Sequence, residues 1–155
     1  MLVTLAGEAA AGCPAAGPVD TTRWIFANHS DFYVFERGSR EYLSGALLQL
    51  LRRNWRCEAP GEVCAVDAYP WTNTQDGDVL EPITYRLVSS TRTRAVVEMA
   101  YTFGWPDTPE RNEPVVSLIA LTKDPESGCW VMDDLVGAQG RSLRNALEEF
   151  PYDGT

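Results

Sequence analysis

The chain has 155 residues, of which 45% are apolar and 23% charged, and its formal net charge is −9. This length and apolar content suffice for one domain with a hydrophobic core and exclude an intrinsically disordered chain. The negative charge repels nucleic-acid backbones, and no apolar run is long enough to span a membrane, so we expect neither nucleic-acid binding nor a membrane span.

The first twenty residues differ in composition from the rest. Residues 1–20 are rich in alanine, glycine and proline, and we interpret them as a leader before one α+β domain at 21–155. A complete secretory signal would begin with a basic residue and would not be interrupted by Glu8. The small-residue run that ends at Cys13 resembles the lipobox of bacterial lipoproteins, although Ala10 stands where leucine is usual. Two interpretations stay open: a residual signal with a lipid anchor at Cys13, and a plain unstructured leader.

Two helices are predicted next. Thr21 or Thr22 is suited to cap a helix that runs to Phe35, because apolar residues recur at helical spacing. Ser39 is predicted to cap a second helix, whose wide apolar stripe extends to Trp55.

Two cysteines follow the second helix. Cys57 and Cys64 lie on either side of Pro60 and Gly61, a turn signal that brings the two sulfurs within disulfide reach. Such a bond requires an oxidising compartment. Two reduced thiols remain the alternative; a metal site does not fit, because His29 is the only histidine and the spacing matches no zinc motif.

The second half of the chain changes to a period of two. After an irregular segment, alternation of apolar and polar residues predicts four antiparallel strands at about 80–90, 92–103, 114–123 and 129–135. A short helix is expected to begin near Ser142. The predicted fold is therefore α+β, with N-terminal helices packed on a curved four-stranded antiparallel sheet that forms a cone, and a short C-terminal helix.

Five segments together resemble a known bacterial domain family. They are Asp31–Phe35, Tyr42–Leu51, Tyr69–Asp76, Gly128–Leu135 and Ser142–Leu147, and they occur in the family's order. The segment Tyr69–Asp76 resembles its (Asp/Tyr)-Pro-(Phe/Trp)-x-Asn-x-Gln-Asp signature. The family has no known function and has the nuclear-transport-factor-2-like, or cystatin-like, fold.

This resemblance implies a small exported bacterial protein. Several domains of the fold are immunity proteins that neutralise toxins, whereas others are enzymes such as ketosteroid isomerase and scytalone dehydratase, so the fold alone does not give the function. We expect a periplasmic or cell-envelope location. The lack of a complete signal peptide leaves a cytoplasmic one as the alternative.

An enzyme of this fold would need a general base inside the cone. The titratable candidates are His29, Asp31, Asp67, Asp76, Asp133 and Asp134. Tyr33 and Tyr69 are candidate oxyanion donors, but tyrosines at such positions usually belong to the core. Phosphate-binding loops, nucleophile elbows and metal triads are missing from the sequence, so we expect no catalytic residue, no cofactor and no metal.

The densest group of polar residues lies in the signature loop. Asn73, Gln75 and Asp76 follow Trp71, and they are expected to satisfy backbone groups of the loop or, alternatively, to line a binding mouth.

The most prominent candidate for partner contact is Trp105, between Gly104 and a proline-stiffened acidic stretch that includes Asp107 and Glu110. A rigid aromatic side chain next to carboxylates is typical of a binding hot spot for a basic protein surface. The alternative is that the ring folds back over the sheet.

Asp133 and Asp134 are assigned either to this partner surface or to helix capping. The predicted function is a non-catalytic protein-binding domain, most concretely an immunity protein for a bacterial toxin or effector. The alternative is a small-molecule-binding or isomerase-like enzyme that uses the cone.

Overall fold

The computed structural model describes residues 12–152 and contains three α-helices, a 3₁₀ turn and four strands. The helices are α1 (Pro18–His29), α2 (Gly45–Glu58) and α3 (Leu143–Glu149), and the 3₁₀ turn is η1 (Pro109–Arg111). The strands are β1 (Asp78–Ser90), β2 (Arg94–Gly104), β3 (Glu113–Lys123) and β4 (Trp130–Val136). The predicted α+β class is confirmed, as are the four strands in nearly the expected positions.

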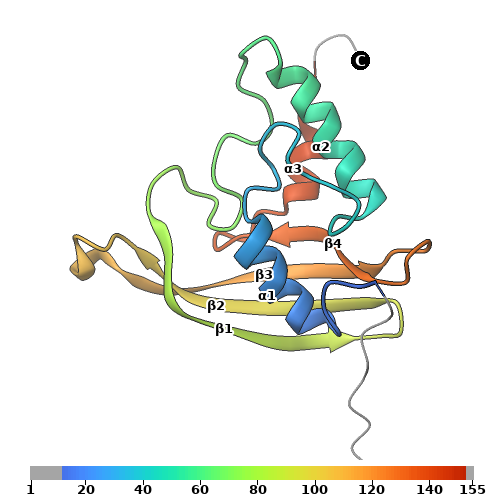
Figure 1. Ribbon diagram of the computed structural model, residues 1–155. Helices are drawn as coiled ribbons and strands as arrows, with labels where there is room; N and C mark the ends of the chain where they lie inside the picture. The colour runs from blue at the N-terminus through green and yellow to red at the C-terminus, as the bar shows by residue number, and fades with distance from the viewer. Residues whose placement is uncertain (1–11, 153–155) are drawn as a thin grey trace, which may run out of the picture.

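The strands form one antiparallel sheet in the order β1-β2-β3-β4. In Figure 1, α1 lies across one face of this sheet, while α2 and α3 stand together beside the β4 edge. The alternation that predicted β2 is real, because every second residue is buried: Ala95, Val97, Met99, Tyr101 and Phe103. No helix within residues 12–152 is long and apolar enough to cross a membrane.

The first helix differs from the prediction at both ends. It begins at Pro18, since proline is suited to the first turn of a helix, and Thr21 and Thr22 are buried inside it and do not cap it. It ends at His29, and the chain continues through hydrogen bonds of the i→i+3 type, such as the one from the Phe32 N–H to the His29 carbonyl (3.1 Å). These turns still bury Phe32 completely, which explains why the apolar spacing looked like a longer helix.

The second helix begins later than predicted. Ser44 caps it by accepting the Leu47 N–H at 3.1 Å, so the expected cap at Ser39 is wrong. Leu43, which lies within the predicted helix, instead forms a parallel bridge with Met132 of β4. Together with the hydrogen bond from the Met132 N–H to the Tyr42 carbonyl (2.8 Å), this bridge fastens the chain before α2 to the β4 edge of the sheet. The last helix begins where predicted, at Leu143, and Ser142 caps it by accepting the Asn145 N–H at 3.2 Å.

The hydrophobic core lies between the inner face of the sheet, the helices and the loop that precedes β1. Its largest fully buried side chains are Trp71, Tyr42, Phe32, Ile25, Leu43, Leu47, Leu48, Leu51, Met99, Ile119, Leu121 and Met132. Burying each large apolar side chain contributes about 1.5–3 kcal/mol, so this cluster is the main source of stability.

Candidate functional site

A disulfide joins Cys57, in the last turn of α2, to Cys64, with their Cα atoms 6.2 Å apart. The turn between them depends on Gly61, whose φ of 87° lies in the left-handed region and whose N–H donates to the Glu58 carbonyl at 2.7 Å. This is the disulfide that the sequence predicted.

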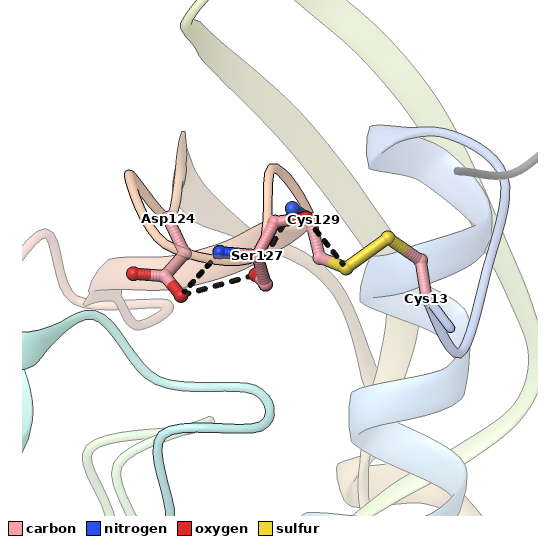
Figure 2. Close-up of a disulfide and its surroundings, with 4 residues drawn as sticks. All are labelled: Cys13, Asp124, Ser127 and Cys129. Atoms are coloured by element: carbon pink, nitrogen blue, oxygen red, sulfur yellow. Dashed lines mark hydrogen bonds between the residues drawn. A yellow bond between two sulfur atoms is a disulfide. The ribbon is translucent and has the colours of Figure 1, made fainter. Parts of the chain in front are cut away.

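A second disulfide was not predicted. It joins Cys13 to Cys129, with their Cα atoms 5.5 Å apart, and Figure 2 shows the bond between the segment that precedes α1 and the turn that leads to β4. The expectation of a lipid anchor at Cys13 is therefore wrong, because the sulfur that would carry the lipid is bonded to another cysteine. Two disulfides indicate an oxidising, extracytoplasmic compartment.

Asp124 organises the turn next to the second disulfide. Its carboxylate accepts hydrogen bonds from the Ser127 hydroxyl (3.0 Å) and N–H (3.3 Å), both drawn in Figure 2, and from the Arg40 guanidinium at 2.8 Å. Burial acts to raise the pKa of Asp124, but the hydrogen bonds from Arg40 and Ser127 outweigh it and hold the pKa below its usual value. The Asp-Pro-Glu-Ser-Gly stretch is a turn signal that indicates this role, whereas the partner Arg40 has no local signal.

Trp71 closes the inner face of the sheet. Its side chain is fully buried, and the indole N–H donates to the Ser30 carbonyl at 3.0 Å. Its own carbonyl accepts the hydroxyls of Tyr101 (3.0 Å) and Ser117 (2.7 Å), which also contact each other at 3.1 Å. The hydroxyls of Tyr101 and Ser117 are thus satisfied by the Trp71 backbone and by each other, and the Trp71 ring packs edge-on against Phe26 and Phe32.

The other residues of the signature loop lie at its surface. Asn73 has a φ of 57° and donates from Nδ2 to the Arg141 carbonyl at 3.4 Å, and Gln75 donates to the Asp67 carbonyl at 3.2 Å. Asp76 is exposed. Asn73 and Gln75 therefore bind backbone carbonyls, as the favoured interpretation of this loop required.

A pocket of about 240 Å³ lies between this loop and α3, lined in part by Asn73 and Gln75. The Arg141 guanidinium and the Asp67 carboxylate also line it and lie 3.9 Å apart. Ala146 of α3 contributes to its apolar wall. The polar groups of the signature loop thus border a shallow site on the surface, away from the inner face of the sheet.

The two adjacent aspartates of β4 are used within the chain. Asp133 accepts the Ser44 hydroxyl at 2.7 Å and the Arg144 guanidinium at 2.9 Å. Asp134 accepts the Ser142 hydroxyl at 2.6 Å and the Arg144 N–H at 3.0 Å. These carboxylates fasten the starts of α2 and α3 to β4, which agrees with the helix-capping alternative for this pair.

A β-bulge explains how both carboxylates reach neighbouring elements. Met132 pairs with Leu121 and Asp134 with Ala120, so Asp133 is an extra residue without a partner opposite. Strict alternation would place the two carboxylates on opposite faces of the sheet, but the bulge interrupts this alternation. Both now bond to Arg144, one through its side chain and one through its backbone N–H.

The loop around Trp105 is ordered by its own hydrogen bonds. The Trp105 N–H donates to Asn112 Oδ1 at 2.9 Å, and a Cβ at Gly104 would clash with that side chain. The half-buried indole packs edge-on against Phe103, with ring centroids 5.4 Å apart, and the Arg111 guanidinium lies 4.1 Å from its centroid. The ring thus folds partly back onto the sheet.

The acidic residues of this loop remain outside. Asp107 and Glu110 are exposed, and among the described residues neither makes an ion pair.

Two of the candidate general bases, His29 and Asp31, have side-chain partners near the end of α1. The His29 ring stacks on Tyr42, with centroids 4.0 Å apart, and Asp31 pairs with Arg37 at 3.1 Å at the surface. Burial raises the pKa of Tyr69 to about 12, although a hydrogen bond with Ser30 opposes this shift.

Burial and the nearby Asp31 carboxylate also raise the pKa of Tyr33. The two tyrosine rings lie against each other, 6.0 Å between centroids, as part of the aromatic packing around the core. Within residues 12–152, no group of three or more histidine, cysteine, aspartate or glutamate side chains is placed to hold a metal ion.

Comparison with known proteins finds one informative relative. The chain is 30% identical over 142 residues to the Escherichia coli (strain K12) protein called "Uncharacterized protein YqhG". The match covers 88% of this chain but only 44% of that protein, so the chain spans less than half the length of this relative. No protein-family model matches the chain, and no solved structure matches it significantly.

Proposed function

We propose that this chain is a non-catalytic protein-binding domain, most concretely an immunity protein that neutralises a bacterial toxin or effector. The proposal includes membership of the nuclear-transport-factor-2-like family that the segment Tyr69–Asp76 resembles. Its partner is a protein with a basic contact surface, which binds the loop that carries Trp105.

The observation that carries the proposal is the filled inner face of the sheet. In an enzyme of this architecture, that face is where substrate and general base would meet. Here Trp71 is fully buried against it, and the Trp71 carbonyl accepts the hydroxyls of Tyr101 and Ser117. A binder has no need of an internal cavity, so a core closed by the chain's own side chains favours binding through an outer surface.

The Trp105 loop supports a basic partner. Asp107 and Glu110 are exposed and unpaired among residues 12–152, so they are free to meet Lys or Arg side chains. The loop backbone is already fixed by the bond between Trp105 and Asn112, which lowers the entropy lost when a partner orders it. The net charge of −9 adds long-range attraction for a basic protein.

We place this binding event in the periplasm or cell envelope. The two disulfides require an oxidising compartment, and the bacterial periplasm is one such compartment.

Co-expression with the neighbouring gene's product tests the proposal. A bacterial host would export that product with and without this chain, and growth and co-purification would be measured. The expected result is growth arrest by the product alone, rescue by this chain, and a stable complex of the two. If the neighbouring product is toxic and this chain neither rescues growth nor binds it, the immunity function is wrong.

The alternative, a small-molecule site, is favoured by the pocket between the signature loop and α3, where Asp67 and Arg141 are 3.9 Å apart. These charges would suit a small ligand that carries both an amine and a carboxylate. Thermal unfolding with a panel of amino acids tests it. A ligand that raises the unfolding temperature of the parent but not of Ala146→Phe, in which the new side chain narrows the pocket, would support this function. An unfolding temperature that no compound raises would exclude ligands of this class.

A further inference from the structure

We propose that the C-terminal half of α2 forms a docking surface for an acidic protein segment that carries an apolar side chain. The surface is the groove lined by Phe35, Glu36, Gly38, Arg52, Trp55, Arg56 and Ala59, which we call the arginine groove. The inference goes beyond the proposed function, since it concerns a partner of opposite charge. It also concerns another end of the molecule: in Figure 1, α2 stands above the sheet, far from the connection between β2 and β3.

Within residues 12–152, the two arginines of this groove make neither an ion pair nor a contact with an aromatic ring. All thirteen basic side chains of the chain lie within residues 12–152. Those that make ion pairs are Arg23, Arg37, Arg40, Arg86, Arg141 and Arg144. Those that lie over aromatic rings without an ion pair are Arg53, Arg111 and Lys123. The four others, Arg52, Arg56, Arg92 and Arg94, make neither kind of contact with residues 12–152.

Helix energetics do not account for this pair. Arg52 and Arg56 are four residues apart on α2, where like charges repel by a few tenths of a kcal/mol. The helix dipole favours a cation in the last turn, which suits Arg56. Arg52 lies further from the end at Glu58, where this effect has decayed. In a chain with 22 acidic residues, a pair of exposed arginines without carboxylates is therefore a feature that folding does not explain.

The groove beside these arginines has an apolar floor and rim. Its volume is about 460 Å³. Trp55 is only 6% exposed and forms the floor, whereas Phe35 is 47% exposed and forms part of the rim. The lack of a side chain at Gly38 lets its backbone pack closely on Trp55 and Leu43, because a Cβ there would lie 3.1 Å from Trp55 Cη2 and 2.7 Å from Leu43 Cδ1. An apolar side chain of moderate size would bury the exposed surface of Phe35.

The charges of the groove select the occupant. Glu36 is the single carboxylate among the lining residues, and it makes no ion pair with Arg52 or Arg56 within 4.0 Å. Each guanidinium is able to bind a carboxylate through two parallel hydrogen bonds. A segment with carboxylates on both sides of one apolar residue would satisfy both arginines and fill the groove. The acidic remainder of the surface would repel the same segment and so confine it to this place.

Fluorescence anisotropy with a defined peptide tests the proposal. The probe is a fluorescein-labelled peptide of alternating aspartate and glutamate with one central phenylalanine, titrated with the whole protein. The test variant is Arg52→Glu with Arg56→Glu. The matched control is Arg92→Glu with Arg94→Glu, which makes the same change in net charge at exposed, unpaired arginines outside the groove. Thermal unfolding of each variant checks the fold, and glutamine replaces glutamate at both pairs if a reversal does not fold.

Saturable binding is expected for the parent protein. The test variant should lower the affinity for the peptide by at least about tenfold, whereas the control should lower it by less than about twofold. Phe35→Ala should lower it by about threefold or more. Trp105→Ala should leave it unchanged, which separates this surface from the proposed immunity function. Three results would overturn the proposal: no saturable binding, equal losses in the two double variants, or a DNA oligonucleotide that binds as tightly as the peptide.

Discussion

Cys13 is bonded to Cys129 across 116 residues of chain, whereas Cys57 is bonded to Cys64 across seven. The long-range bond fastens the segment before α1 to the turn that leads to β4, and the short one closes only the end of α2. The two bonds therefore constrain the unfolded chain to very different extents.

Removing the long-range disulfide should cost more stability. In the chain-entropy model, Cys13→Ser with Cys129→Ser should lower the free energy of unfolding by about 4–5 kcal/mol. Cys57→Ser with Cys64→Ser should lower it by about 2–3 kcal/mol, because the loop it opens is short. Urea unfolding of the two double variants and the parent, without reductant, measures both losses. Equal losses would show that chain entropy is not the controlling quantity.

Asp124 should make stability depend on pH at the acid end. Because its pKa is lowered in the folded protein, the carboxylate stabilises the fold above its unfolded pKa, and this stabilisation is lost as the pH falls through the folded value. Asp124→Asn should therefore cost about 1–3 kcal/mol near neutral pH, and the difference from the parent should shrink below about pH 4. Urea unfolding across this range measures the difference. A constant difference would contradict the role of Arg40 and Ser127 as partners of the charged form.

Asp134 should contribute to the stability of the fold and not to the affinity for the partner. Its carboxylate accepts three hydrogen bonds, from the N–H groups of Leu135 and Arg144 and from the Ser142 hydroxyl. Asp134→Ala should cost about 1.5–3 kcal/mol, because the start of α3 loses its attachment to β4. Asp76→Ala, at an exposed aspartate, is the control and should change stability by less than about 0.5 kcal/mol. Similar losses of stability in the two variants would show that the Asp134 hydrogen bonds do not stabilise the fold.

The features that were predictable depend on short stretches of sequence. The strands follow from a period of two, the start of the last helix near Ser142 from an apolar periodic run, and the Cys57–Cys64 bond from a turn between nearby cysteines. The end of the first helix was not predictable in the same way. Phe32 is buried at helical spacing by turns that are not helical, and periodicity alone does not distinguish the two.

The features that were missed depend on the arrangement of distant segments. Cys13 meets Cys129, and Arg40 meets Asp124, because of how the sheet is assembled. The direction of Asp133 depends on a bulge that is defined only against the neighbouring strand. The unpaired state of Arg52 likewise requires knowledge of where every carboxylate lies, so the arginine groove had no sequence signal.

His29 should act as a packing residue. Its ring stacks on Tyr42 and lies edge-on to Trp24, with centroids 4.8 Å apart, so His29→Ala should cost about 0.5–1.5 kcal/mol of stability. Rescue of growth in the co-expression experiment should be nearly unchanged. A folded His29→Ala protein that no longer protects the host would indicate that this imidazole does chemistry, and the non-catalytic proposal would then be wrong.

Trp105 should supply much of the affinity for a basic partner. The indole is half-buried against Phe103, and its ordered loop presents Asp107 and Glu110 beside it. Trp105→Ala should weaken the complex by about thirtyfold or more, equivalent to ~2 kcal/mol. The matched control is Trp130→Ala, which removes another half-buried indole with a basic side chain, Lys123, over its ring.

The acidic residues of the same loop should act on the rate of association. Asp107→Lys with Glu110→Lys replaces two exposed carboxylates that would attract the partner before contact, so this variant should associate more slowly and dissociate at nearly the parent rate. High salt should slow the parent in the same way, because it screens the attraction. Calorimetry and stopped-flow fluorescence on the purified pair separate the two effects. If Trp105→Ala binds as tightly as Trp130→Ala, the loop is not the anchor, and if association does not depend on salt, its carboxylates do not steer the partner.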